Sequence, residues 1–151
     1  MKEIIIGGFL KMKIIVKVHT EGCEPQIIEG GNWIDLSTAE EITLKRGDSV
    51  LINLGVSIKL PDHMEAHLAS RSSTFKKYGV IQTNGFGVID NSYSGDNDIW
   101  KLPVYATRDA VIPKGVRIAQ FRIFAIQPNI ECEYVDKMVD NDRGGFGSTG
   151  D

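Results

Sequence analysis

Apolar residues recur at every second position along much of the chain, a pattern typical of β-strands that bury one face. The longest run places apolar side chains on a single face from Val50 to Leu60. Shorter runs with the same period occupy residues 14–18, 42–44, 64–68, 100–106, 117–124 and 130–135, and the adjacent apolar residues Val80 and Ile81 also indicate a strand. The pattern therefore predicts many short strands rather than helices.

One segment, Ser70–Gly79, predicts a short helix instead. Ser72 or Ser73 can cap its N-terminus, and Gly79 suits the left-handed conformation that ends many helices. The Asn84-Gly85 pair that follows is a strong turn signal and predicts a hairpin. Short strands, regularly spaced turns and one short helix together predict an all-β fold, a jelly roll or distorted barrel.

The strand interpretation decides how a proline and two histidines are understood. Pro103 has no backbone donor, so we expect its strand to be bulged or at a sheet edge. His63 and His67 have the i, i+4 spacing of a helical metal pair, but on a strand they lie two rungs apart on a polar face. With no third ligand spaced nearby, we interpret them as solvated histidines.

Composition narrows the possible functions. The chain has 151 residues, 42% of them hydrophobic and 25% charged, which fits one domain with a substantial core. A net charge of −3 with no basic block argues against nucleic-acid binding. The apolar stretch 4–10 is too short to span a membrane, so we expect no membrane association. Cys23 and Cys132 have no metal-binding spacing and are expected to be reduced thiols in the cytoplasm.

The two ends of the chain differ from its middle. Met12 is a candidate second start site, so residues 1–11 form a possible N-terminal extension and residues 12–136 the β domain. Residues 137–151 are polar and rich in glycine. Such ends are usually disordered. This one also carries an arginine, a phenylalanine and two hydroxyls, which could clamp phosphate and stack on a base. That second interpretation predicts an arm that closes over a ligand.

The stretch from Gly87 to Gly95 combines a strand end with candidate chemistry. Two apolar residues lead to Asp90, and Tyr93 follows three residues later. The residue types also suit an ordinary turn. As a site, the strand end would hold the aspartate more rigidly than a loop does, and an ionised aspartate can accept a proton from water.

Two further segments offer possible phosphate contacts. Arg71-Ser72-Ser73 at the predicted helix start combines backbone N–H groups with hydroxyls, although capping alone would also explain the serines. Arg117 and Gln120 follow a lysine–glycine turn, and their pattern fits a structural role and a phosphate-binding role equally well.

Five segments in this order resemble the motifs of the homotrimeric dUTPase family. They are Asn32–Leu36, which keeps the Asp-Leu pair of the first motif, Arg71-Ser72-Ser73, Gly87–Gly95, Gly115–Gln120 and Arg143–Gly150, the last being two residues shorter than is usual. The third matches Gly-hydrophobic-Ile-Asp-x-x-Tyr-x-Gly in full. Each motif is weak alone, but five in order are specific. The divergent first and fifth motifs suit a phage or prophage branch.

The resemblance implies a jelly-roll homotrimer whose active sites combine more than one subunit. It implies Mg²⁺-dependent hydrolysis of dUTP to dUMP and pyrophosphate, which limits uracil incorporation into DNA and supplies dUMP for dTMP synthesis. Mg²⁺ would bridge the phosphates and keep several waters, with Asp35 reaching it through water rather than as part of a dedicated cage.

The resemblance also implies a role for each matched residue. Asp90 would activate the water that attacks the α-phosphorus, and Tyr93 would pack under the deoxyribose and exclude a 2′-hydroxyl. The uracil would pair with Asn84 and with the hairpin backbone at Gly87 and Ile89. The remaining substrate-binding residues are Arg71, Ser72, Ser73 and Gln120 at the phosphates, Phe146 over the uracil, and Arg143, Gly147, Ser148 and Thr149 in the arm near the γ-phosphate.

Two other functions fit part of this pattern. The dCTP deaminases share the fold and an Arg-Ser-Ser motif but use a glutamate, whereas this chain has Asp90 with Tyr93. A non-catalytic nucleotide-binding or protein-interaction trimer would have no need of Asp90. The acidic stretch from Ser94 to Asp98 beside the site is interpreted as a solvated turn.

Overall fold

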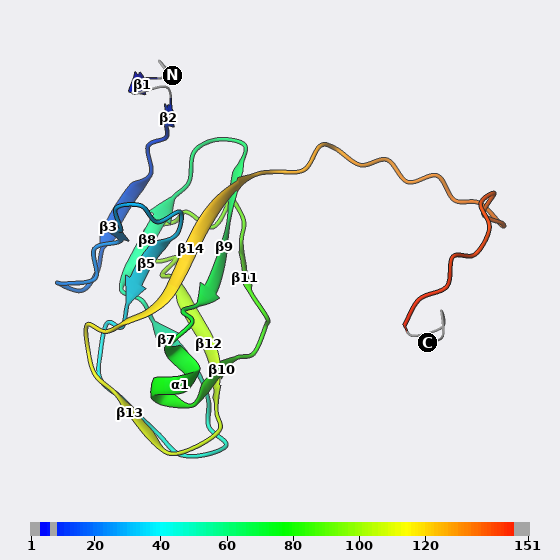
Figure 1. Cartoon of the computed structure of the whole chain (residues 1–151). Coiled ribbons are helices and arrows are strands. Elements are labelled where there is room, and N and C mark those ends of the chain that lie inside the picture. The colour runs from blue at the N-terminus through cyan, green and yellow to red at the C-terminus, as the bar shows by residue number, and fades with distance from the viewer. Residues whose placement is uncertain (1–3, 7–8, 147–151) are drawn as a thin grey trace.

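The computed structural model describes residues 4–6 and 9–146 (Figure 1). These residues form short strands and one helix, as the alternating pattern predicts. The strands are β1 Ile4–Ile6, β2 Phe9–Lys11, β3 Ile15–Val18, β4 Gln26–Ile27, β5 Ile34–Ser37, β6 Ile42–Leu44, β7 Ser49–Asn53, β8 Val56–Lys59, β9 Met64–Ser70, β10 Val80–Gln82, β11 Gly87–Ile89, β12 Lys101–Ala106, β13 Ala110–Ile112 and β14 Arg117–Ala125. The helix α1 spans Thr74–Tyr78.

Two antiparallel sheets enclose the core. One has the order β11-β9-β14-β5-β4 and the other the order β10-β12-β7, while β3-β8, β6-β13 and β1-β2 form two-stranded sheets. The Trp100 ring, just before β12, meets the Phe121 ring of β14 edge-on, with centroids 5.0 Å apart. Both side chains are fully buried, and such a pair adds about 0.5–1.5 kcal/mol beyond its burial. This contact fixes β14, the central strand of the larger sheet.

The alternating run from Val50 to Leu60 keeps one face in the core but forms two strands in different sheets. β7 pairs with β12, whereas β8 pairs with β3. The break lies at Gly55, which has a φ of 68°. A Cβ added there would lie 2.8 Å from Cys23 Sγ, so only glycine fits this corner. Both cysteines, Cys23 and Cys132, are free thiols.

The expectation that Pro103 marks an edge or a bulge is wrong. Its strand β12 lies at the centre of the three-stranded sheet and pairs with β7 in an unbroken register. The carbonyl of Pro103 accepts from the Thr83 N–H at 3.1 Å, and Thr83 lies one residue beyond the end of β10. The N–H that Pro103 lacks would have faced Thr83, beyond the last residue of β10. Its absence therefore removes no hydrogen bond between β10 and β12.

The predicted hairpin at Asn84-Gly85 is also wrong, because β10 and β11 do not pair with each other. β10 pairs with β12 in the smaller sheet, and β11 pairs with β9 in the larger one. The turn residues bend the chain, as the Phe86 N–H donates to the Asn84 carbonyl at 2.7 Å. They carry it from one sheet to the other, so the segment is an arch between sheets.

The helix is shorter than predicted, and its two ends differ in how they are held. Gly79 takes the expected left-handed conformation, with a φ of 65°, and its N–H donates to the Phe75 carbonyl. The Arg108 guanidinium donates to the Lys76 and Lys77 carbonyls, both at 2.9 Å, which satisfies acceptors left free at the helix end. At the other end, no side chain caps the helix.

The interpretation of both histidines as solvated is wrong for His67. His63 lies in the turn before β9 with a φ of 61°. His67 is in β9, and its ring lies between those of Phe86 and Phe124, with centroids 4.9 and 4.4 Å away. Its neighbours come from strand pairing with β11 and β14, which the alternation along one strand does not reveal.

The predicted last strand at residues 130–135 is absent. After β14 the chain runs away from the barrel as an extended segment, orange to red in Figure 1. Every residue from 126 to 144 is exposed. A strand needs a neighbour, and within the described part of this single chain the segment finds none. The described residues include no helix long and apolar enough to cross a membrane.

Candidate active site

Three charged side chains meet where β5, β9 and β14 lie side by side. Asp35 is on β5, Arg71 directly follows β9, and Arg117 begins β14. Oδ2 of Asp35 lies 3.2 Å from Nε of Arg71 and 3.1 Å from an Nη of Arg117. Because β14 pairs with both neighbours, the sheet gathers residues from three separate segments and also sets Gln120 opposite Asp35.

This cluster of Asp35, Arg71 and Arg117 has a net positive charge. The Asp35 side chain is only 6% exposed, so the arginines take the place of water around its carboxylate. The side chains of Arg71 and Arg117 are 25% and 40% exposed, and each guanidinium has more donors than one oxygen can use. Such a cluster suits the binding of a phosphate chain. For Arg117, the structural and phosphate-binding roles are therefore compatible.

Polar groups surround this cluster. Gln120 Nε2 donates to the Ser70 carbonyl at 3.3 Å. Ser72 is exposed and Ser73 is half-buried. The capping expectation is wrong, because Ser73 already has helical angles, φ −89° and ψ −7°, and makes no capping bond. A five-residue helix has little dipole of its own, so the anion-binding capacity here rests on side chains.

Asp90 stands at the end of β11 in very different surroundings. It is exposed, and in the described residues no ion pair or side-chain hydrogen bond occupies its carboxylate. The next residue fixes its position: Asn91 Nδ2 donates to the carbonyls of Pro61 at 2.6 Å and Met64 at 2.9 Å. The end of β11 is therefore hydrogen-bonded to the start of β9 and to the turn before it, while the Asp90 carboxylate stays open to a ligand or water.

Tyr93 is held by the loop that follows Asp90. Its hydroxyl donates to the Ile99 carbonyl at 3.1 Å, and 39% of the residue is exposed. The hydroxyl is thus engaged within the loop, and the ring is what a ligand can contact.

The acidic stretch beyond Tyr93 is a solvent-exposed turn, as expected, and it is also held by a hydrogen bond and an ion pair. Asp98 accepts from the Gly95 N–H at 2.8 Å, and Asp96 lies 2.6 Å from Nζ of Lys17 on β3. The hydrogen bond and charge of Lys17 hold the pKa of Asp96 below its ordinary value. These contacts tie the loop to the barrel.

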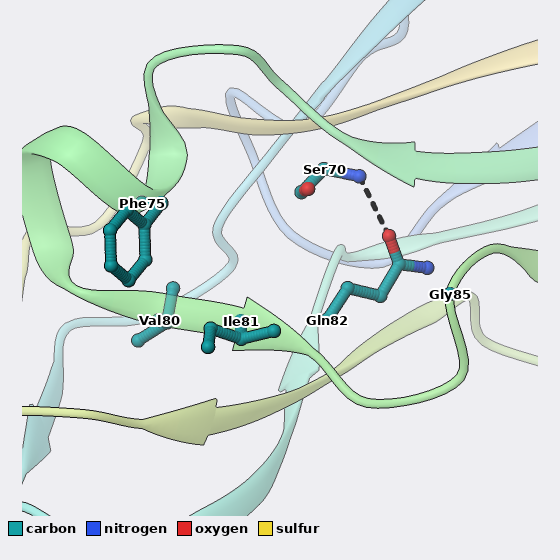
Figure 2. A pocket seen from close by; sticks show the side chains of 6 residues that line it. All are labelled: Ser70, Phe75, Val80, Ile81, Gln82 and Gly85. Carbon is teal, nitrogen blue, oxygen red and sulfur yellow. Dashed lines mark hydrogen bonds between the residues drawn. The ribbon is translucent and has the colours of Figure 1, made fainter. Parts of the chain in front are cut away.

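An open pocket of about 380 Å³ lies between α1 and β10 (Figure 2). Phe75, Val80 and Ile81 give it an apolar wall, while Ser70, Gln82 and Gly85 give it a polar side. Figure 2 shows the Gln82 side chain reaching Ser70. Asn84 lies beside this polar side, because Gln82 also donates to its side-chain oxygen at 3.0 Å.

The predicted contacts at Gly87 and Ile89 involve backbone atoms only. Ile89 is 9% exposed, and its side chain belongs to the core. Gly87 lies opposite Leu68, and an added Cβ would come within 3.0 Å of the Leu68 Cβ. Both residues therefore fix the path of β11.

The cluster around Asp35 and the carboxylate of Asp90 lie far apart along β9. The register pairs Ile89 with Ala66, so Asp90 continues opposite Glu65, six residues from Arg71. At about 3.3 Å per residue, the separation along the strand is roughly 20 Å. That is well beyond the length of a triphosphate, so within one chain these groups do not share one phosphate.

The structure brings neither Arg143 nor Phe146, the predicted arm residues that it describes, to the cluster around Asp35 or to the Asp90 carboxylate. Arg143 and Phe146 are exposed in the segment that leaves the barrel (Figure 1). Gly147, Ser148 and Thr149 lie outside the described residues.

Sequence reasoning missed two residues that shape the site. Asn91 occupies a variable position of its motif, and its partners come from a distant turn, so nothing local reveals it. Gln82 gave a usable signal: it is a polar residue two positions after Val80, at a strand position expected to face the core.

Comparisons with known proteins identify the family of this chain. The family model described as dUTPase matches residues 32–150. The SPbeta prophage-derived deoxyuridine 5'-triphosphate nucleotidohydrolase of Bacillus subtilis (strain 168) is 53% identical over 123 residues, covering 82% of this chain and 87% of the relative. The deoxyuridine 5'-triphosphate nucleotidohydrolase of Clostridium novyi (strain NT) is 35% identical over 145 residues, covering 92% and 99%.

Solved structures show the same fold. A Staphylococcus bacteriophage 80alpha dUTPase mutant with dUpNHpp has a TM-score of 0.74 at 20% identity, covering 91% of this chain and 98% of that one. A mutant dUTPase of phage phi11 of S. aureus, described with a structural Mg(II) ion, has a TM-score of 0.71 at 18% identity, covering 85% and 99%. With the family model matching most of its length, this chain belongs to the dUTPase family, and its 53% identity to a prophage-derived relative places it with the phage-type members.

Proposed function

We propose that this protein hydrolyses dUTP to dUMP and pyrophosphate. Relatives that are 53% and 35% identical to this chain are named for that activity. The observation that carries the proposal is the contrast between Asp90, an exposed carboxylate fixed at a strand end, and the buried, arginine-paired Asp35. Binding alone needs no open carboxylate, whereas hydrolysis needs a base that can reach a water molecule.

In the proposed reaction Asp90 accepts a proton from a water molecule. The water oxygen forms a bond to the α-phosphorus, and the bond from that phosphorus to the oxygen bridging to the β-phosphate breaks. Pyrophosphate leaves with the electron pair of the broken bond, and the proton on Asp90 returns to solvent. The hydrogen bonds of Asn91 support this role, because they hold the strand end without occupying the Asp90 carboxylate.

Selection of the sugar and base follows from the groups beside Asp90. The Tyr93 ring, with its hydroxyl held by the Ile99 carbonyl, can lie against a deoxyribose and leave no space for a 2′-hydroxyl. Asn84 is exposed and can meet the edge of uracil together with the backbone of the arch. Hydrolysis of dUTP by such a site limits uracil incorporation into DNA and supplies dUMP.

Arg71, Ser72, Ser73 and Gln120 are proposed to bind the phosphates, with Arg117 added to this set. Mg²⁺ fits as a partner of the triphosphate: the described residues contain no group of three side chains suited to a metal, and Oδ2 of Asp35 is taken by two arginines. When bound, the ion neutralises charge on the triphosphate. A contact from Asp35 to the ion would use its other oxygen through water.

The separation along β9 supports a site shared between copies of the chain. One dUTP cannot meet Asp90 and Arg71 of the same chain across roughly 20 Å, so the phosphate-binding cluster that serves one Asp90 comes from another copy. A homotrimer with three shared sites satisfies this requirement. The arm of residues 137–151 then closes over a neighbouring site, with Phe146 on the uracil and Arg143, Gly147, Ser148 and Thr149 near the γ-phosphate.

An assay with two substrates tests the proposal. We expect pyrophosphate from dUTP in the presence of Mg²⁺, and no ammonia from dCTP. Release of ammonia from dCTP without pyrophosphate from dUTP would instead identify a deaminase. Tight binding of a non-hydrolysable dUTP analogue with no turnover of dUTP would identify a binding protein.

A further inference from the structure

Gln82 joins the two sheets next to the proposed base-binding residue. It is 9% exposed, and all three of its side-chain hydrogen bonds are made within the protein. Its Oε1 accepts from the Ser70 N–H at 2.8 Å. Its Nε2 donates to the Leu68 carbonyl at 3.0 Å and to Oδ1 of Asn84 at 3.0 Å.

The backbone leaves Gln82 a single amide orientation. The Ser70 N–H can only donate, so it requires the oxygen of the amide, and the Leu68 carbonyl can only accept, so it requires the nitrogen. Both backbone groups belong to β9, whose position is set by pairing with β11 and β14. A reversed Gln82 amide would face two mismatched, poorly solvated partners, which is strongly unfavourable.

The orientation of Gln82 in turn sets that of Asn84. The second hydrogen of Gln82 Nε2 points to the Asn84 side chain and needs an acceptor there. Asn84 therefore turns its oxygen toward Gln82 and presents its NH₂ group, a donor, to the exposed side. Without Gln82, an exposed asparagine could present either end of its amide.

We propose that Gln82 is a positioning residue for base selection: by fixing the donor end of Asn84 outward, it makes the site accept a 4-oxo pyrimidine and reject a 4-amino one. Uracil has a carbonyl acceptor at position 4, whereas cytosine has an amino donor that would oppose the Asn84 donor. This inference rests on the proposed function, in which Asn84 meets the base. A site that pairs with a substrate group rejects analogues lacking it more strongly than an apolar pocket does.

The first test reverses the orientation. In Gln82→Glu the side chain still accepts from Ser70, but its carboxylate accepts from Asn84 as well, which turns the Asn84 oxygen outward. We expect the ratio of kcat/KM for dUTP to that for dCTP to fall at least tenfold. Gln82→Met leaves Asn84 free to adopt either orientation and should give a smaller fall. A folded Gln82→Glu protein with an unchanged ratio would overturn the proposal.

A double variant separates positioning from general damage to the fold. In an Asn84→Ala background the orientation of Asn84 no longer exists, so adding Gln82→Glu should leave the substrate ratio unchanged. An equal further fall in that background would show that Gln82 acts on the ratio by another route, and the proposal would fail.

A substrate analogue tests the same idea in the unaltered protein, where folding is not in question. The 4-thio analogue of dUTP keeps the N3 hydrogen of uracil but replaces the 4-oxo acceptor with sulfur, a much weaker acceptor. We expect its kcat/KM to be at least tenfold below that of dUTP, with the difference largely lost in Asn84→Ala. Equal use of both substrates would overturn this inference alone, whereas no turnover of dUTP would overturn the proposed function and this inference together.

Discussion

The candidate site has a paired half and an open half, and the two are built differently. In the paired half, Asp35, Arg71 and Arg117 contact one another within a single chain. In the open half, Asp90 and residues 126–144 are exposed, with no side chain of the described part of the chain occupying the carboxylate of Asp90. Folding of one chain therefore assembles the first half, whereas in the proposed function the second half is completed by substrate and by another copy of the chain. Changes in the paired half should affect stability and binding, whereas changes at Asp90 and in the arm should affect only activity.

The largest expected effect is that of Asp90→Asn in the open half. The amide keeps the size of the side chain but cannot accept the proton, so we expect kcat to fall about 10²- to 10⁴-fold. Binding of a non-hydrolysable dUTP analogue and the melting temperature should be unchanged. Pyrophosphate release, calorimetry and thermal unfolding measure the three quantities.

A matched control for Asp90→Asn is Asp62→Asn, in the exposed turn before β9. It should behave like the unaltered protein in all three measurements. Normal turnover in Asp90→Asn would remove Asp90 from the reaction.

Deletion of residues 143–151 should have the next largest effect. If the arm closes over a site on another copy, kcat/KM should fall about 10²-fold, while the melting temperature stays unchanged because the segment leading to it, residues 126–144, is exposed. Arg143→Ala should reproduce part of the loss, and Lys137→Ala, in the same segment but outside the motif, should not. Full activity of the truncated protein would show that the arm is not part of the site.

The sequence indicated candidate residues for the site but not the residues that they contact in space. Motifs singled out Asp35, Arg71, Asp90 and Tyr93 as candidate residues, and the roles assigned to them stay predictions. The bonds of Asn91 to Pro61 and Met64 span 27 to 30 positions, and those of Gln82 to Ser70 and Leu68 span 12 to 14. Such partners depend on which strands pair, and that information is not local.

The same limit explains the errors in the fold. Alternation correctly identified which face of Val50–Leu60 is buried, because burial of a face is a local property of the strand. It could not show that Gly55 divides the run between two sheets, or that the residues around Asn84-Gly85 join two sheets rather than two paired strands. At residues 130–135 the alternation was present, but no partner strand of the same chain was.

Asp35→Asn probes the paired half and should change two properties together. Without the carboxylate, the charges of Arg71 and Arg117 repel each other, which should lower the free energy of unfolding by about 1–2 kcal/mol, given their partial exposure. The arginines also lose their fixed orientation, so we expect KM for dUTP to rise about tenfold. Urea unfolding and steady-state kinetics measure these changes.

The surface pair of Lys45 and Asp109 supplies the control for Asp35→Asn. Their atoms lie 3.4 Å apart, with the side chains 75% and 63% exposed. Asp109→Asn should leave KM unchanged. An Asp35→Asn protein as stable as Asp109→Asn, with an unaltered KM, would contradict the division into a paired and an open half.

The smallest expected effect concerns the loop that holds Tyr93. Lys17 keeps the pKa of Asp96 below its ordinary value of 3.8, so the pair stabilises the fold fully above that pH and loses its contribution as the pH falls through the lower, folded pKa. Asp96→Asn should therefore lower the melting temperature by ~1–2 °C at neutral pH, with kcat changed less than about twofold, and Lys17→Met should match it. In acid the gap between variant and unaltered protein should close. If the difference in melting temperature persisted in acid, the effect would come from the backbone of the loop, where the Asp96 carbonyl accepts from the Ser57 hydroxyl. The ion pair between Lys17 and Asp96 would then not be what holds the loop of Tyr93.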